Sequence, residues 1–225
     1  MAPPPVVLFD LDGTLTNPKV GITVTMQHAL KAVGVTVDDP DELTWCIGPP
    51  IIDNFARFGV TGDRAIDALA AYRERYDRVG AYENVVFDGI PELLASLARD
   101  GRRLAVATSK AEHSAEAILE HFGLAGYFEF IGGASPDSVR SIKADVVAYV
   151  LAHLGDPDPA TAVMVGDRHH DIDGARLNHL ASIAVTWGFA EPGELEAAHP
   201  DRIVSTIAEL TAALGVLEDR ATGIR

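Results

Sequence analysis

Short apolar segments alternate with helical segments in the part of the chain that begins at Val85, and this alternation constrains the fold most. The apolar segments read RRLAVATS, FEFIGG, TAVMVGD, ASIAVTW and DRIVS. Such alternation is typical of right-handed strand–helix–strand units, which build a parallel sheet with helices on both faces. The apolar run at residues 6–9 has the same character and is predicted to belong to this sheet. We therefore expect a Rossmann-like α/β domain.

A block of helical pattern separates the first predicted strand from the others. Between residues 18 and 82, apolar residues recur at helical spacing and glycine or proline interrupts the pattern, as in GITVTMQHALKAVG and GDRAIDALAAYRERYDRVG. We interpret residues 18–82 as an α-helical insertion in an α/β core that comprises residues 1–17 and 83–225. A chain of 225 residues with 48% hydrophobic residues is large enough for both parts.

Composition excludes several classes of partner. The formal net charge of -15 opposes non-specific binding to nucleic acid and to anionic membranes, because both need clustered lysine and arginine. No segment approaches the roughly 20 apolar residues of a membrane span. The single cysteine, Cys46, cannot form an internal disulfide, which agrees with a reducing compartment. We expect a cytoplasmic protein with neither nucleic acid nor membrane as a partner.

Polar side chains follow the predicted strands at their carboxyl ends, the edge at which open parallel sheets bind ligands. Each of them could serve as a helix N-cap, but matching positions after several strands indicate a shared site. The set comprises Asp10 and Asp12 after the first strand, Thr108, Ser109 and Lys110 after LAVA, and Asp167 with Asp171 after AVMVG.

The acids of this set suit phosphoryl transfer. Asp10 and Asp12 lie two residues apart in extended chain, so they address one centre. Close carboxylates raise one another's pKa unless a cation compensates, so one can act as an ionised nucleophile and the other as a proton carrier. Mg²⁺ prefers oxygen ligands such as Asp10 and Asp167. An aspartate nucleophile, Mg²⁺ and a lysine can transfer a phosphoryl group through an aspartyl-phosphate.

Four motifs together resemble those of the haloacid dehalogenase (HAD) superfamily. They are, in the order of the family, DLDGTLT, VATSK, the lysine of SIKADVVAYVL and VGDRHHD. The helical block resembles the inserted C1 cap of phosphoglycolate-phosphatase-like members, and CIGPP and GDRHHDIDGA are similar to that branch. The resemblance implies a HAD core with a helical cap.

The resemblance also implies roles for the acids. Asp10 is expected to be the nucleophile and a metal ligand. Asp12 is expected to be the general acid and base, with its backbone carbonyl as a second ligand of Mg²⁺. Asp167 is expected to supply a further ligand, and Asp171 is expected to hold the waters of the metal or a catalytic lysine.

The phosphate is expected to meet three other residues of the motifs. By resemblance, the Thr108 hydroxyl and the Ser109 backbone N–H bind the phosphoryl oxygens. Lys143 neutralises the phosphate and orients Asp10. Taken alone, Lys143 would be interpreted as a solvated lysine at a helix start.

Substrate choice is assigned to the helical block. The connections TNPK and ENVVFDG can act as hinges that let the block close over the site. The loop between two predicted helices is the candidate for specificity, although a plain helix connector explains it equally well. It consists of Ile47, Gly48, Pro49, Pro50 and Ile51.

For five further residues, the sequence indicates a structural role or leaves the role undecided. Gly13 and Thr14 are expected to shape the turn after the acids. Trp187 and Phe189 are expected to be packing residues. Lys110 either helps to bind phosphate or is exposed.

Residues 168–170, the sequence RHH, could contact an anion or the surroundings of the metal, but we interpret them as exposed polar residues at a helix start.

The leading hypothesis is a Mg²⁺-dependent phosphomonoester hydrolase for a small phosphorylated metabolite. By resemblance, 2-phosphoglycolate comes first and a nucleoside monophosphate, as for a 5'-nucleotidase, second. A phosphomutase, a protein-tyrosine-phosphate phosphatase and a regulatory phospho-ligand-binding protein without turnover remain alternatives. Dehalogenation is disfavoured, because Asp12 offers a proton that an alkoxide needs and a halide does not.

Overall fold

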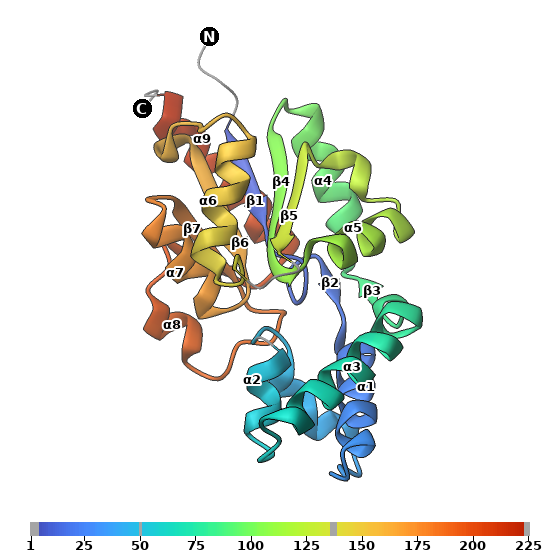
Figure 1. Cartoon of the computed structure of the whole chain (residues 1–225). Coiled ribbons are helices and arrows are strands. Elements are labelled where there is room, and N and C mark those ends of the chain that lie inside the picture. Colours follow the sequence, from blue (N-terminus) through green and yellow to red (C-terminus); the bar gives the residue numbers. More distant parts are fainter. Residues whose placement is uncertain (1–4, 50, 136–138, 223–225) are drawn as a thin grey trace. The chain divides into compact units, whose positions relative to one another are not determined.

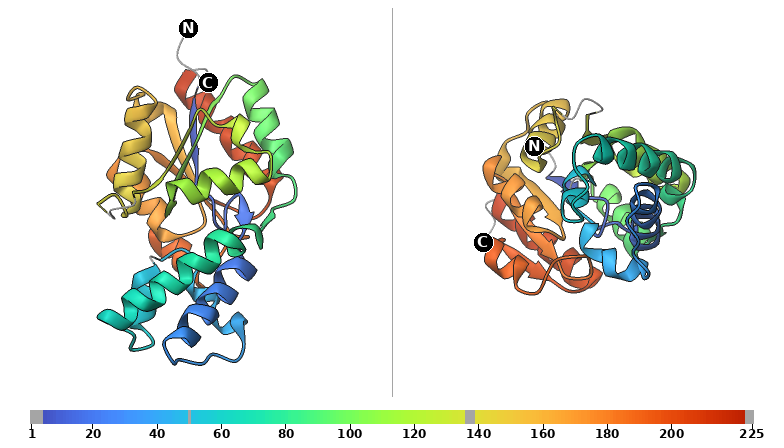
Figure 2. Two further views of the ribbon diagram at one scale, coloured as in Figure 1. Left: turned by 45° about the vertical axis from the view of Figure 1, so that its right-hand side comes forward. Right: turned by 60° about the horizontal axis from the view of Figure 1, so that its bottom comes forward.

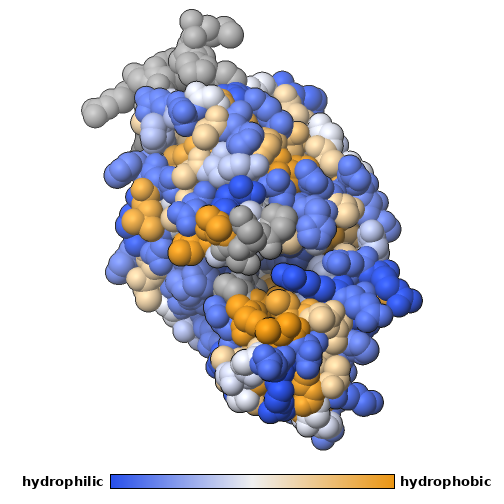
Figure 3. Space-filling model, viewed as in Figure 1, coloured by the Kyte–Doolittle hydropathy of each residue, from blue (hydrophilic) through white to orange (hydrophobic). Residues whose placement is uncertain are grey.

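The computed structural model describes residues 5–49, 51–135 and 139–222, and the side chains up to residue 215. The chain divides into two compact units (Figure 1). The first, the core unit, comprises Met1–Leu15 and Val86–Arg225, and the second, the helical unit, comprises Thr16–Val85. Hydrophilic residues occupy most of the surface drawn in Figure 3. Among the described residues, no helix combines the length and the hydropathy needed to cross a membrane.

A six-stranded sheet forms the centre of the core unit. Its order is β5-β4-β1-β6-β7-β8, and every pairing is parallel, which confirms the predicted α/β class. In the middle of the sheet, Leu8 pairs with Ala105 on one side and with Met164 on the other. The strands are β1 (Val6–Phe9), β4 (Arg103–Ala111), β5 (Phe130–Ala134), β6 (Ala162–Gly166), β7 (Ala181–Val185) and β8 (Arg202–Val204).

Helices cover both faces of this sheet (Figure 2). On one face, α6 contacts β4 and β5 while α7 contacts β6 and β7, and α6 packs against α7. Elsewhere α5 contacts β4 and β5, and α4 packs against α9. The helices are α4 (Ile90–Arg99), α5 (Glu112–His121), α6 (Lys143–His153), α7 (His169–Leu177), α8 (Glu194–Ala198) and α9 (Ile207–Thr222), with 3₁₀ turns η3 (Ala125–Tyr127) and η4 (Pro159–Thr161).

The central strand β1 consists of apolar residues alone, and its burial explains why. All four of its residues are at most 1% exposed. Val6 and Leu8 pack into a cluster with residues of α6, among them Val146 and Val150. A strand buried on both faces has no polar side to alternate with. The first polar side chain, Asp10, therefore comes where the strand ends.

The helical unit is built on two long helices. In this unit, α1 packs against α3, and a Cβ on Gly21 of α1 would overlap the carbonyl oxygen of Gly80. Part of the segment predicted as helical, Pro40–Cys46, is a 3₁₀ helix, and the two-residue strands pair with each other, which the sequence did not indicate. The elements are β2 (Thr16–Asn17), α1 (Lys19–Ala32), η1 (Pro40–Cys46), α2 (Ile51–Ala56), α3 (Asp63–Arg78), η2 (Gly80–Tyr82) and β3 (Val85–Val86).

Candidate active site

Three buried acids meet at the carboxyl ends of β1 and β6. The two strands are neighbours, and the pairing continues one residue beyond β1, where Asp10 N–H donates to the carbonyl of Val165 at 2.9 Å. Carboxylate oxygens of Asp10, Asp167 and Asp171 all lie within 4.8 Å of one another. The residues are only 7%, 0% and 1% exposed. The predicted convergence of these acids on one edge of the sheet is present in the structure.

Lys143 joins two of these acids. It is the first residue of α6, and its Nζ lies 2.7 Å from Asp10 Oδ1 and 2.8 Å from Asp171 Oδ1. The same Nζ donates to the carbonyl of Ala107 at 3.0 Å. Burial opposes the ammonium form, but the carboxylates of Asp10 and Asp171 outweigh it and raise the pKa of Lys143. Lys143 is thus a buried cation and not a solvated lysine.

Asp12 has a separate cationic partner. Lys110 Nζ lies 2.5 Å from Asp12 Oδ2, and the two side chains are 9% and 11% exposed. Burial raises the pKa of Asp12, and Lys110 opposes this rise. The other oxygen, Oδ1, is buried and has no hydrogen-bond partner among the described residues. Lys110, whose role the sequence left open, therefore acts on the carboxylate of Asp12.

Asp167 is held by neutral groups. Thr14 Oγ1 donates to its Oδ1 at 3.1 Å, and Phe189 N–H donates to its Oδ2 at 2.8 Å. Trp187 Nε1 in turn donates to the carbonyl of Thr14 at 3.2 Å. Sequence reasoning treated Thr14, Trp187 and Phe189 as architectural or packing residues and missed these contacts. The sequence feature that could have indicated a close approach of the backbone here is Gly188, a glycine between two aromatic residues shortly after β7.

The negative charge of Asp10, Asp167 and Asp171 exceeds the positive charge of Lys143, the cation that contacts Asp10 and Asp171. Burial first, and then Asp171 and Asp10, raise the pKa of Asp167 well above its usual range. Burial likewise raises the pKa of Asp171 to about 6, although Lys143 opposes the rise. A divalent cation would offset this excess, and the donors are all carboxylate oxygens, the ligands that hard cations prefer. The residues present fit such a metal.

The two hydroxyl residues of the VATSK motif lie near the carboxyl end of β4. Thr108 is buried, and its Oγ1 accepts a hydrogen bond from Lys110 N–H at 3.3 Å. Ser109 is half-buried. Both residues lie within β4 and not after it, as the sequence had suggested, because this strand continues to Ala111. Since β4 pairs with β1, they lie on the strand next to the one that Asp10 follows.

The residues after Asp167 form a structural cluster with α8. Arg168 Nε and His169 Nδ1 lie 2.9 and 2.7 Å from Glu194 Oε1, and His169 N–H also donates to this oxygen. Arg168 is 8% exposed, so its prediction as an exposed polar residue is wrong. His170 is half-buried, and its pKa is lowered, first by burial. The cluster ties the start of α7 to α8.

The specificity loop predicted at residues 47–51 lies in the helical unit. Ile47 is 1% exposed, Gly48 is exposed with φ of 107°, and Pro49 is half-buried. Ile51 begins α2 and is half-buried. Pro50 lies outside the described residues.

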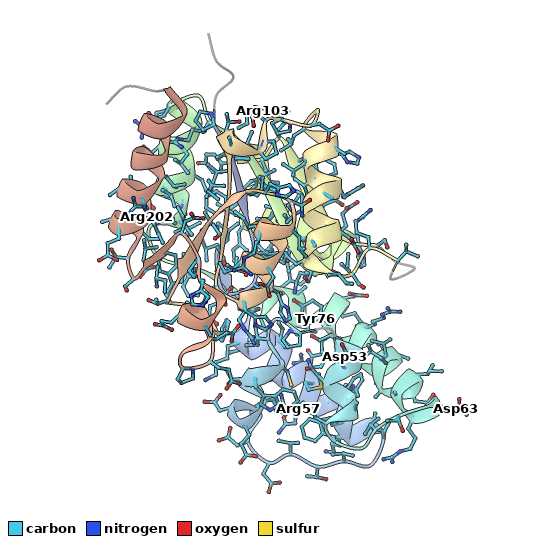
Figure 4. All side chains as sticks on the ribbon, turned by 90° about the vertical axis from the view of Figure 1, so that its left-hand side faces the viewer. Asp53, Arg57, Asp63, Tyr76, Arg103 and Arg202 are labelled. Carbon is cyan, nitrogen blue, oxygen red and sulfur yellow. The ribbon has the colours of Figure 1, made fainter. Side chains whose placement is uncertain are left out.

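One prominent cation of the core unit belongs elsewhere. Arg103, the first residue of β4, pairs with Glu129 at 2.6 Å and donates to the carbonyl of Leu154. Since it pairs in register with Val6, it lies at the amino ends of the strands (Figure 4). Among the described ion pairs, the acids of the site pair with Lys110 and Lys143.

A parallel α/β core with buried acids and a lysine at its strand ends agrees with a phosphatase of the haloacid dehalogenase class. Residues 7–185 match the family profile described as haloacid dehalogenase-like hydrolase, and the chain belongs to this family. The resemblance seen in the sequence motifs is confirmed.

Relatives carry several names. A tyrosine-protein kinase PtkA from Mycobacterium tuberculosis is 45% identical, over 95% of this chain and 73% of that protein. A 5'-nucleotidase from Pseudomonas aeruginosa is 42% identical, over 93% and 95% of the two chains. A phosphoglycolate phosphatase from Agrobacterium fabrum is 32% identical, over 93% and 92%.

A solved structure supports the same class. The crystal structure described as a "predicted phosphatase" from Clostridium acetobutylicum has a TM-score of 0.89 and 40% sequence identity, and the similarity covers 96% of this chain and 100% of that one. The fold is thus shared along nearly the whole chain.

Proposed function

We propose that this phosphatase is a Mg²⁺-dependent phosphomonoester hydrolase that acts through an aspartyl-phosphate on a small phosphorylated metabolite. One observation carries the proposal: Lys143 Nζ holds Asp10 Oδ1 at 2.7 Å, while oxygens of Asp167 and Asp171 lie within 4.8 Å of Asp10. A carboxylate held by one cation at the edge of a metal-binding set is oriented as a nucleophile needs to be.

In the first step, a carboxylate oxygen of Asp10 forms a bond to phosphorus and the ester bond to the leaving oxygen breaks. Asp12 gives its proton to that oxygen. The buried environment, which raises the pKa of Asp12, favours a protonated fraction of this acid, and Lys110 limits that fraction. The unpartnered Oδ1 is the atom free for this transfer.

In the second step, Asp12 takes a proton from water, and the resulting hydroxide attacks phosphorus. The bond between phosphorus and Asp10 breaks, which releases phosphate, restores the Asp10 carboxylate and leaves Asp12 protonated for the next turnover. Asp12 thus serves once as acid and once as base.

The remaining residues of the site bind phosphate and metal in this proposal. Asp10, Asp167 and the Asp12 carbonyl would hold Mg²⁺, which when bound neutralises charge on the phosphoryl group. The Thr108 hydroxyl and the Ser109 N–H would bind phosphoryl oxygens together with Lys143. Asp171 lies 2.8 Å from Lys143, which supports its role in holding this lysine.

We assign substrate choice to the helical unit, acting as a C1 cap. Of the proposed specificity loop, Gly48, Pro49 and Ile51 retain exposed surface, whereas Ile47 supports the loop from within. The sequence put 2-phosphoglycolate first. The higher identity to the 5'-nucleotidase, 42% against 32% for the phosphoglycolate phosphatase, now favours nucleoside monophosphates.

Protein tyrosine is the second candidate substrate: the identity to PtkA is 45%, but the match covers 73% of that protein, against 95% of the 5'-nucleotidase. A hydrolase would release phosphate from a phosphotyrosine peptide. A kinase would instead transfer a phosphoryl group from a nucleotide to tyrosine, with no net release of inorganic phosphate.

The test compares wild type with Asp10→Asn and with Asp145→Asn, an exposed aspartate on α6, in Mg²⁺ and in EDTA. We expect Mg²⁺-dependent release of phosphate from p-nitrophenyl phosphate, a loss of about 1,000-fold or more in Asp10→Asn, and no loss in Asp145→Asn. A panel of nucleoside monophosphates, 2-phosphoglycolate and phosphotyrosine peptide then ranks kcat/KM. Undiminished turnover by Asp10→Asn would contradict the mechanism.

A further inference from the structure

Asp167 differs from the other acids of the site in the kind of partner it has. Asp10 and Asp171 lie against the ammonium group of Lys143, and Asp12 lies against that of Lys110. Within the described residues, the contacts of Asp167 are the Thr14 hydroxyl and the Phe189 N–H, one on each oxygen. These donors orient the carboxylate but bring no positive charge to it, so a bound cation would supply the charge that offsets it.

At two glycines, the backbone comes very close to the carboxylate of Asp167. A Cβ on Gly13 would lie 2.2 Å from Asp167 Oδ2, and a Cβ on Gly188 would lie 2.3 Å from it. Real Cβ atoms never come so close to an oxygen, so a side chain at either position would displace the carboxylate. Gly13 also needs its φ of 92°, whereas Gly188 is required by space alone.

A third contact joins the two loops that carry these groups. Trp187 Nε1 donates to the carbonyl of Thr14, which links the loop after β7 to the loop after β1. Asp167 is fully buried between them. Its side chain therefore cannot turn without breaking hydrogen bonds to both loops.

We infer that Thr14 and the Trp187–Phe189 segment form a positioning element that fixes Asp167 for binding of the divalent cation. The inference rests on the proposed function, because it assigns these residues to the metal step. Groups behind a metal ligand commonly change metal affinity by about 10- to 100-fold when they are removed. The element predicts an effect on metal binding, separate from phosphate binding.

The test measures Mg²⁺ binding by calorimetry on the full chain, with no substrate present. We expect Thr14→Val, which removes only the hydroxyl, to weaken Mg²⁺ binding about 10-fold or more, and Thr14→Ser to restore it. Gly188→Ala is expected to weaken it further, because the added Cβ displaces Asp167. Thr23→Val is the matched control: Thr23 is a buried threonine of α1 whose hydroxyl donates to a backbone carbonyl, and its loss should leave Mg²⁺ affinity unchanged.

Activity assays then separate the positioning element from a general loss of structure. At saturating Mg²⁺, Thr14→Val should keep the wild-type KM for p-nitrophenyl phosphate, and its activation curve should shift to higher Mg²⁺ concentration. Equal Mg²⁺ affinity of wild type and Thr14→Val would overturn the inference, whether or not Gly188→Ala folds. If wild type binds Mg²⁺ more tightly than Thr14→Val but releases no phosphate, the positioning element stands and the proposed function fails.

Discussion

In the core unit, Asp10, Asp167, Asp171 and Lys143 lie against one another with less than a tenth of each residue exposed. In the helical unit, the ion pair of Arg75 and Glu83 leaves 19% and 30% of the two side chains exposed. Burying several like charges opposes folding, since each one loses its hydration. A partly exposed pair has a smaller cost of this kind. The difference agrees with the proposal that the buried set serves chemistry, whereas the partly exposed pair supports the fold.

Polar side chains of the helical unit also differ in their partners from the buried acids and the lysine of the site. In the helical unit, Gln27 and Asn54 donate to the backbone carbonyls of Val37 and Cys46, and Arg75 also contacts Thr25. These contacts satisfy backbone groups and close the chain on itself. In the core unit, the buried Lys143 donates to Asp10, and the carboxylate of Asp167 lies close to those of Asp10 and Asp171.

Removal of Lys143 should have the largest effect. Lys143→Met leaves Asp10 and Asp171 without their cation, so we expect phosphate release to fall by about 1,000-fold or more, and the free energy of unfolding in EDTA to fall by about 3 kcal/mol. Arg75→Met in the helical unit is the counterpart and should cost about 1 kcal/mol or less with kcat retained. Urea unfolding and a p-nitrophenyl phosphate assay measure both. Similar losses of kcat in the two variants would remove the contrast between the units.

The loop at residues 47–51 divides into a supporting and a contacting part. Ile47 is buried, so Ile47→Ala should lower the free energy of unfolding by about 3 kcal/mol. Ile51 is half-buried, and Ile51→Ala should cost less stability while it changes the ratio of kcat/KM values between nucleoside monophosphates and 2-phosphoglycolate. Thermal unfolding and the metabolite panel distinguish the two effects. An unchanged ratio in Ile51→Ala would take substrate choice away from this loop.

The sequence predicted the site residues whose position follows from the end of a strand. It missed the contacts made by backbone N–H groups and the contacts between loops. Asp10 and Asp167 could be assigned, because a polar residue after a buried apolar run must lie at the carboxyl edge of a parallel sheet. The N–H of Phe189 could not, because nearly every residue has one. The partner of Lys110 could not be predicted either, since 98 residues separate it from Asp12. Two-residue strands such as β2 and β3 are too short for any pattern to show.

The smallest expected effect is a pH dependence of stability that comes from Glu194. Burial alone would raise the pKa of Glu194, but hydrogen bonds from Arg168 Nε and from the N–H groups of His169 and Glu191 outweigh it and lower the pKa to about 2. A lowered pKa adds stability above the ordinary value of 4.5, and this stability is lost as the pH falls toward 2. With a side chain that is 10% exposed, Glu194 should contribute on the order of 2 kcal/mol at pH 6.

Glu194→Gln should therefore be less stable than wild type at pH 6, and the difference should shrink between pH 4.5 and pH 2 because wild type loses its advantage there. Urea unfolding at several pH values in EDTA measures this difference. Glu83→Gln, which removes the acid of the partly exposed pair in the helical unit, is the control and should change the free energy of unfolding by less than about 1 kcal/mol at pH 6. A difference for Glu194→Gln that stays constant from pH 6 to pH 2 would show that packing of α8, and not the charge on Glu194, stabilises the start of α7.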